Sequence, residues 1–203
     1  MAATVWFISD LHIGHQLVAG LRGFDDVTAH DNYLAAQWDS CVGDDETIWV
    51  LGDISSGGSA AQRNALAWLK NRPGVKHLIA GNHDGIHPMH RDAHKWHAQY
   101  QDVFVSVAQS ARRRIHGQEV LLNHFPYQGD QPWHRHDQWK LPDYGVPVLH
   151  GHTHLSDTES LSLKGTRQIH VGVDAHDFRP VSIEYVRNKL AGSDVVQDGR
   201  RIL

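Results

Sequence analysis

Five clusters of polar residues in this chain each follow a short apolar segment that is typical of a buried strand. These clusters are Asp10 with His12, Asp53, Asn82 with His83, His124, and His152 with His154. Carboxylate, amide and imidazole groups together suit divalent ions such as Mn²⁺, Fe²⁺, Zn²⁺ and Co²⁺. Because ligand sites in α/β folds lie outside the carboxyl ends of strands, the recurrence predicts a metal site assembled from separate stretches of the chain.

Two of these clusters place their residues two positions apart. Residues i and i+2 of an extended chain point to the same side, so we expect Asp10 and His12 to direct two ligands at one centre. The same reasoning applies to His152 and His154. Each cluster alone has a plainer explanation, since Gly52–Asp53 is also a common turn signal and the chain contains 18 histidines. The joint order of the clusters is what indicates metal chemistry.

The elements that must position these clusters alternate through the first half of the chain. Strands are predicted at Thr4–Ser9, Thr47–Leu51 and Lys76–Ala80. Helical spacing of apolar residues predicts helices at Thr28–Cys41 and Ala60–Lys70. Alternation of strand and helix is the βαβ pattern of an α/β fold with a parallel sheet.

The second half of the chain favours strands. We expect Val103–Ala108 and Arg112–His116 to form an antiparallel pair, and Gln128–Pro142 to form a loop. Further strands are predicted at Glu119–Asn123, Val146–His150, Ile169–Val173 and Val181–Val186, followed by a weakly ordered tail of about a dozen residues. The whole chain, residues 1–203, is therefore expected to be a single α/β domain with two sheets packed face to face and helices outside.

Composition excludes several classes of protein. Hydrophobic residues make up 40% and charged residues 21%, as in globular proteins. The net charge of −4 and the lack of a long basic run argue against a stable nucleic-acid complex. We find no apolar run near the roughly 20 residues that cross a bilayer, and no basic region typical of a signal peptide. The single cysteine, Cys41, excludes an internal disulfide. We expect a cytoplasmic protein without membrane contact, and the oligomeric state has no signal.

From Ser9 to His154 the chain carries, in order, the motifs SDLH, LGD, GNHD, NH and GHTH. This set resembles the calcineurin-like metallophosphoesterase superfamily, whose pattern is DxH, GD, GNH with Asp or Glu, H, and GHxH. The resemblance implies a four-layer α/β/β/α sandwich with two divalent metal ions, which lie about 3.5–4 Å apart in two-metal sites. Mn²⁺ is the ion we expect first, with Fe²⁺, Zn²⁺ or Co²⁺ as alternatives.

The resemblance also implies a role for each matching residue. Asp10, His12 and His154 would bind the first metal ion; Asn82, His124 and His152 would bind the second; and Asp53 would bind both. A hydroxide that bridges the two ions would attack the phosphate ester. His83 is the expected general acid or charge stabiliser for the leaving group. Asp84 is expected to orient the His83 imidazole, although an Asp at this position also suits a cap for the following segment.

Departures from relatives narrow the expected substrate. Protein Ser/Thr phosphatases resemble GDxVDRG at the second motif, whereas Gly52–Gly57 reads GDISSG and lacks their Asp and Arg. Ser56 also replaces the iron-binding Tyr of purple acid phosphatases. Nucleases of the superfamily carry extra domains for which this chain has no room. The expected substrate is a small phosphodiester or nucleotide, such as a 2′,3′- or 3′,5′-cyclic nucleotide. A small metal-dependent nuclease and a non-catalytic binding module are the alternatives.

Other polar residues have two interpretations each. His90, His94 and His97 have helical spacing and fit either a separate zinc site or, as we favour, a solvated face. The segment from Trp133 to Trp139, including His134, Arg135 and His136, is either a wall of the active-site mouth or a surface loop. His15 and Arg22 follow the first motif and are candidates for substrate contact. Trp6, Trp49 and Trp68 are predicted core residues.

Overall fold

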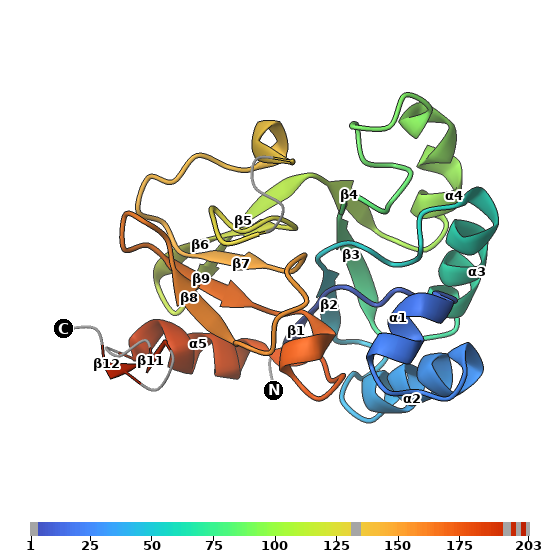
Figure 1. Cartoon of the computed structure of the whole chain (residues 1–203), viewed down its shortest axis with the longest axis horizontal. Helices are drawn as coiled ribbons and strands as arrows, with labels where there is room; N and C mark the ends of the chain where they lie inside the picture. The colour runs from blue at the N-terminus through green and yellow to red at the C-terminus, as the bar shows by residue number, and fades with distance from the viewer. Residues whose placement is uncertain (1–3, 131–134, 193–195, 198–199, 202–203) are drawn as a thin grey trace.

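The computed structural model describes residues 4–130, 135–192, 196–197 and 200–201 (Figure 1). The first of two five-stranded sheets has the order β10-β1-β2-β3-β4. Its strands are β10 (Val181–Ser182), β1 (Val5–Ile8), β2 (Thr47–Val50), β3 (Val75–Ile79) and β4 (Ser106–Ala108). Strands β1 to β4 are parallel, and β10 is antiparallel to β1. The carboxyl ends of β1, β2 and β3 therefore meet at one edge of this sheet.

Four helices lie on the side of the first sheet that faces away from the second sheet (Figure 1). They are α1 (Gln16–Leu21), α2 (Val27–Asp39), α3 (Ser59–Lys70) and α4 (His97–Gln101), the last preceded by the 3-10 helix η1 (Ala93–Trp96). Helix α2 begins at Asp26, whose side chain accepts the amide of Ala29 at 2.8 Å. Apolar residues such as Leu34 and Leu69 pack against Val50 of the sheet and are buried. Burial of such side chains is the main stabilising contribution of these helices.

The second sheet has the order β5-β6-β7-β9-β8. Its strands are β5 (Ser110–Ile115), β6 (Gln118–Asn123), β7 (Val148–His150), β9 (Arg167–His170) and β8 (Glu159–Leu161). Pairing is parallel between β6 and β7 and between β7 and β9, and antiparallel at both outer pairs. The chain between β6 and β7 contains the 3-10 helix η2 (Asp137–Trp139), and η3 (Val173–Ala175) follows β9.

The two sheets pack face to face through buried apolar side chains, among them Leu51, Leu122 and Leu149. Helix α5 (Ile183–Ala191) adds Val186 to this layer. The predicted fold class is confirmed: two mixed sheets flanked by helices. Trp49 lies in the layer between the sheets, whereas Trp6 and Trp68 are half-buried against the helical layer. Among the described helices, not one combines the length and the apolar character needed to cross a bilayer.

Several predicted elements differ in the structure. The predicted pairing of Val103–Ala108 with Arg112–His116 is wrong, because β4 joins β3 in the first sheet while β5 starts the second sheet. The strand predicted at Val181–Val186 ends at Ser182, whose hydroxyl accepts the amide of Tyr185 and caps α5. Alternation of apolar residues there concealed the helical spacing of Ile183, Val186 and Leu190. Helix α1 and strand β8 were not predicted, and within the predicted tail β11 (Val196–Gln197) pairs with β12 (Arg200–Arg201).

Candidate metal centre

The predicted ligand residues converge where β1, β2, β3, β6 and β7 end. The structure contains two groups of potential ligands, Asp10 with His12 and His154, and Asp53 with His124 and His152. Within each group the ligand atoms lie within 4.8 Å of one another. Each group joins residues that are more than 90 positions apart in the sequence. Such convergence of carboxylates and imidazoles suits a divalent metal ion in each group.

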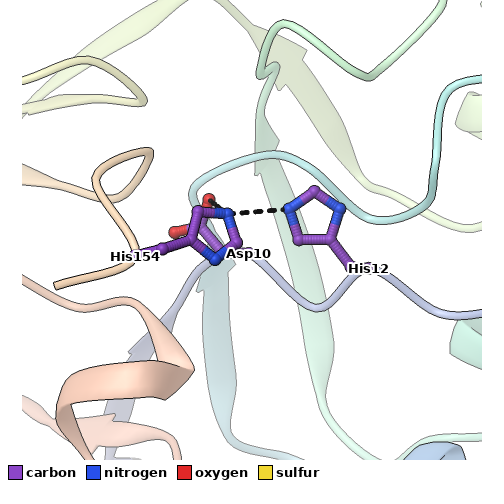
Figure 2. Close-up of side chains that lie close together, drawn as sticks. All are labelled: Asp10, His12 and His154. Carbon is purple, nitrogen blue, oxygen red and sulfur yellow. Dashed lines mark hydrogen bonds and ion pairs between the residues drawn. The ribbon is translucent and has the colours of Figure 1, made fainter. Parts of the chain in front are cut away.

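Figure 2 shows the first group, in which two imidazoles and one carboxylate face a common point. The Nε2 atoms of His12 and His154 lie 3.0 Å apart. Nε2 of His154 lies 3.8 Å from Oδ1 of Asp10. Asp10 and His12 come from the chain that leaves β1, whereas His154 comes from the loop after β7. The first group therefore brings together residues from the loops of both sheets.

Asp53, a member of the second group, also faces the first group. Its Oδ2 atom is 3.4 Å from Nε2 of His124 in the second group and 3.8 Å from Nε2 of His12 in the first. Asn82 lies beside the second group, because its Oδ1 atom is 3.1 Å from Nε2 of His124. One carboxylate within reach of imidazoles from both groups is the arrangement that a ligand shared by two ions requires.

The backbone at these residues is not extended, contrary to the reasoning from residues two apart. Five of the predicted ligands have positive φ angles: Asp10 (60°), His12 (49°), Asp53 (55°), His152 (72°) and His154 (53°). This left-handed conformation is uncommon outside glycine and costs free energy. His152 and His154 point to different groups, whereas Asp10 and His12, which also have positive φ angles, share the first group as expected. Backbone strain is concentrated where the candidate site requires particular side-chain directions.

The glycines of the second and third motifs allow the loops to approach closely. Gly52 has a φ of +90°, and a β-carbon there would lie 2.5 Å from the amide nitrogen of Gly81 and 2.7 Å from Nδ1 of His124. A β-carbon on Gly81 would lie 2.9 Å from Cε1 of His124. These distances are too short for any side chain, so glycine at both positions lets Asp53, Asn82 and His124 come together.

Asp84 does not orient His83, and this prediction is corrected. Asp84 is fully buried, and its carboxylate accepts the amides of Asp53 and Ile54 at 3.0 Å and of Gly81 at 2.8 Å. Among the hydrogen bonds of the described residues, none joins Asp84 to the His83 imidazole. Burial, together with the carboxylate of Asp53, raises the pKa of Asp84 to about 7. Asp84 fixes the loops after β2 and β3 relative to each other.

Arg22 is buried behind the candidate ligands and stabilises their loops. The structure does not support its expected contact with substrate. Its side chain is 4% exposed and donates to the carbonyl of Asp10 at 2.7 Å and to both oxygens of Asp174. Asp174 in turn lies 3.0 Å from Nδ1 of His154. A carboxylate behind a metal-binding histidine fixes the ring and its tautomer. Asp174 was not among the predicted site residues, although it directly follows the strand predicted at Ile169–Val173.

His83 lies at the mouth of the site. Its side chain is 41% exposed, its Nε2 atom is 4.0 Å from Oδ2 of Asp53, and its backbone amide donates to Oδ1 of Asp53 at 2.8 Å. The ring of His15 lies beside that of His12, with centroids 5.6 Å apart. A cleft of about 160 Å³ is lined by Asp53, Asn82, His83, Asp130, Arg135, His136, His152 and His154. The cleft gives a small anionic group access to the candidate ligands.

The loop between β6 and β7 supplies three residues of this cleft, Asp130, Arg135 and His136. The His136 ring stacks on Phe125 with centroids 5.0 Å apart and meets His152 edge-on at 5.3 Å. The predicted wall at the mouth is present at Arg135 and His136. Trp133 and His134 of the same prediction lie outside the described residues. Trp139 contacts His87.

His90, His94 and His97 do not share one helical face. His94 lies in η1, α4 begins at His97, and His90 precedes both. All three side chains are exposed, and in the part of the chain that the structure describes they do not belong to a group of ligand atoms. His90 Nε2 lies 2.9 Å from the carbonyl oxygen of Asn82 and so supports the third motif.

The electrostatics of the site fit a metal ion. Burial lowers the pKa of His12 to about 4 and that of His152 to about 3, so both rings are neutral and have a lone pair available. Burial opposes charge on His124 too, but the facing carboxylate of Asp53 raises its pKa to about 9. Burial also disfavours charge on Asp53, yet His124 and His12 hold its pKa below the usual range. The buried Asp53 carboxylate is therefore ionised and supplies negative charge to the site.

Comparisons with known proteins agree with this geometry. Residues 3–156 match the calcineurin-like phosphoesterase family. The chain is 51% identical over 182 residues to the Gene 66 protein of Mycobacterium phage L5, covering 85% of this chain and 87% of that protein. It is 49% identical over 186 residues to the Gene 66 protein of Mycobacterium phage D29, covering 88% and 92%. A protein of unknown function from Aquifex aeolicus, AQ665, superposes with a TM-score of 0.67 at 21% identity, covering 93% of this chain and 99% of that one, and shares the fold.

Proposed function

Because the chain belongs to the calcineurin-like phosphoesterase family, we propose that it is a phosphodiesterase that uses two divalent metal ions to hydrolyse small diesters such as 2′,3′- or 3′,5′-cyclic nucleotides. Family membership and the two groups of ligands support a metal-dependent phosphoesterase. The observation that carries the proposal for two ions is the position of Asp53, whose Oδ2 lies 3.4 Å from His124 and 3.8 Å from His12.

The ligand types suit binding of a phosphate. Asn82 and the histidines are neutral when they bind a cation, so the negative ligand charge comes from Asp10 and Asp53. Two divalent ions then leave a positive surplus that attracts a phosphate anion. When bound, such ions activate a water molecule and withdraw charge from phosphoryl oxygens. Mn²⁺ is our first choice, since mixed oxygen and nitrogen ligands suit it.

Residues of the chain around the cleft have separable roles. Arg135 and His136 line the cleft and offer N–H donors to phosphoryl oxygens. His83 is exposed to the cleft and lies beside Asp53, so its imidazolium can donate a proton to the departing oxygen. Phe125 supports His136 by stacking at 5.0 Å. Asp84 and Asp174 keep the ligand loops in place without touching substrate.

Support for a diester substrate comes from what the second motif lacks. Ser56 and Gly57 stand where protein phosphatases have an Asp that braces the catalytic His and an Arg that holds phosphate. With fewer charged groups to hold a dianionic monoester, a monoanionic diester is the better match. Diesters with one small alcohol, or cyclic diesters, also suit a cleft of about 160 Å³.

The test is hydrolysis of bis(p-nitrophenyl) phosphate and of cyclic nucleotides under Mn²⁺. We expect turnover by the unaltered protein and losses of at least about a hundredfold in kcat/KM for Asp53→Asn and Asn82→Ala. Asp102→Ala is the matched control, because Asp102 is exposed, pairs with Lys70 and lies away from the cleft. Absence of turnover with every divalent metal tried would end the enzyme proposal. Cutting of oligonucleotides in preference to small diesters would favour a nuclease.

A further inference from the structure

The imidazole of His83 needs a support that its predicted partner does not supply. The side chain is 41% exposed, and among the described residues no hydrogen bond reaches either ring nitrogen. The Asp84 carboxylate is turned toward the loop after β2. Ser56 stands where protein phosphatases carry the Asp that braces this histidine. A ring that has to meet a departing oxygen must still be held in one orientation.

The backbone of Gly57 is one of the surfaces against which this ring packs. A β-carbon at Gly57 would lie 3.4 Å from Nδ1 of His83 and 3.3 Å from its carbonyl oxygen. Gly57 has a φ of +95°, a conformation that suits glycine and allows this close approach. On another side the ring meets His12 edge-on, with centroids 5.4 Å apart. The position of Gly57 therefore limits how far the His83 ring can turn.

A buried amide holds Gly57 in this position. Gln62 comes from α3 and is 2% exposed, and its Nε2 donates to the carbonyl of Gly57 at 2.9 Å. Its Oε1 accepts the amide of Gly85 at 2.7 Å and the hydroxyl of Tyr100 at 2.7 Å. One side chain thus joins the residue that faces the His83 ring to the loop just beyond His83.

These contacts require an amide at position 62. The backbone amide of Gly85 can only donate and the carbonyl of Gly57 can only accept, so the buried group must offer one acceptor and one donor. A carboxylate would place a second acceptor against the Gly57 carbonyl, and an apolar side chain would leave both backbone groups unpaired. The side chain of Gln62 is therefore matched to the two loops that enclose His83.

Other contacts fix the main chain of the third motif and leave the ring free to turn. The backbone amide of His83 donates to Oδ1 of Asp53 at 2.8 Å. Nε2 of His90 lies 2.9 Å from the carbonyl oxygen of Asn82. Neither contact involves the imidazole of His83, whereas Gly57 packs against it directly.

We propose that Gln62 is a positioning residue for the reaction: through Gly57 it holds the His83 imidazole in the orientation that meets the leaving group. The proposal rests on the proposed function, because a leaving group exists only if the protein hydrolyses a phosphate ester. It adds a residue that lies outside every motif of the family pattern and does not touch substrate. Loss of Gln62 should slow the step that His83 assists while the metal ions still bind.

The orientation of the ring can be measured without metal or substrate. In NMR spectra of the full chain in EDTA, the imidazole signal that is absent from His83→Ala identifies His83, and this signal should shift in Gln62→Met. Gln62→Asn, whose amide is one methylene shorter and cannot span both loops, should shift it too and serves if Gln62→Met does not fold. Tyr100→Phe is the matched control, because it removes one hydrogen bond of Gln62 and leaves those to Gly57 and Gly85. An unmoved His83 signal in the Gln62 variants, or an equal shift in Tyr100→Phe, would overturn the proposal.

Gly57→Ala tests the contact between loop and ring directly. An added methyl group 3.4 Å from Nδ1 should displace the His83 ring and shift its signal. Gly58→Ala is the matched control, because nothing lies within 4 Å of a β-carbon at that neighbouring position. A His83 signal that does not respond to Gly57→Ala would also overturn the proposal.

Kinetics separate positioning from a contribution to folding alone. In Gln62→Met, kcat for 2′,3′-cyclic AMP under Mn²⁺ should fall at least about tenfold, because a misplaced reacting group can cost about a hundredfold. The loss should be smaller for bis(p-nitrophenyl) phosphate, whose leaving group needs no proton, and KM should change little for both. Added to His83→Ala, Gln62→Met should cost nothing further, since both changes remove the same interaction. Equal losses for the two substrates, or a further loss of about tenfold in the double variant, would overturn the proposal.

The two proposals can fail separately. Absence of turnover of every diester by the unaltered protein would overturn the proposed function, whereas the NMR comparison reports on the His83 ring in either case. With diester hydrolysis intact, an unmoved His83 signal in the Gln62 variants would overturn the role of Gln62 alone.

Discussion

Asp84 offers a quantitative test of the role that the structure gives it. Its buried carboxylate accepts three backbone amides, at 3.0, 3.0 and 2.8 Å, from the loops that carry Asp53 and Gly81. Asp84→Ala removes the acceptor and leaves three buried N–H groups without a partner. Each such group costs about 1–3 kcal/mol. The surrounding loops can relax partly around the missing side chain, so the cost per group should lie near the lower end of this range. We therefore expect a loss of about 3 kcal/mol in the free energy of unfolding.

The assay is thermal and urea unfolding in EDTA, followed by tryptophan fluorescence, so that metal binding does not contribute. For a chain of this size about 1 kcal/mol corresponds to about 2–4 °C, which predicts a fall of about 6–12 °C in Tm. Asp102→Ala, which removes an exposed pair with Lys70, should change stability by at most about 1 kcal/mol. A loss below about 1 kcal/mol for Asp84→Ala would refute the reasoning.

Three further outcomes are expected. Asp174→Asn removes the negative charge behind His154 and should weaken Mn²⁺ binding at the first group by about 10–100-fold, seen as loss of one of two binding steps in a metal titration; two unchanged steps would contradict this. His83→Ala should lower kcat by about 10²–10⁴-fold with an alkoxide leaving group, and less with nitrophenolate, which needs no proton; equal losses for both would argue against a general acid. EDTA should abolish hydrolysis and added Mn²⁺ should restore it, whereas activity that persists without metal would contradict a metal-dependent reaction.

The strand ends that carry the candidate ligands were predictable from local sequence. Each of β1, β2, β3, β6 and β7 is a short segment followed within three residues by a polar ligand type. Parallel strands bring such ends to one edge of a sheet, so convergence followed from the pattern without knowledge of the loops. The family resemblance added which residue joins which group.

The loop backbone was not predictable in the same way. Positive φ angles at Asp10 and His154 arise from contacts made only after folding, such as those of Arg22 with the Asp10 carbonyl and of Asp174 with His154. Asp84 looked like a partner of the adjacent His83, yet its carboxylate turns toward β2 because amides from that loop point to it. Long-range hydrogen bonds of this kind leave no periodic signal in the sequence.

Tertiary context also decided the second half of the chain. The residues after Ser182 have strand-like composition, but the hydroxyl of Ser182 caps a helix that packs Val186 against the sheets. The strand ending at Ala108 and the strand starting at Ser110 are close in sequence but belong to different sheets. Strand propensity identifies the segment, whereas its partner depends on packing of the whole sandwich.

The central claim is that Asp53 is shared by two metal ions, and anomalous diffraction from crystals grown with Mn²⁺ tests it most directly. We expect two peaks about 3.5–4 Å apart, one beside Asp10, His12 and His154, the other beside Asn82, His124 and His152, with the Asp53 carboxylate between them. A single peak at saturating Mn²⁺, or two peaks of which only one lies within bonding distance of Asp53, would contradict the account.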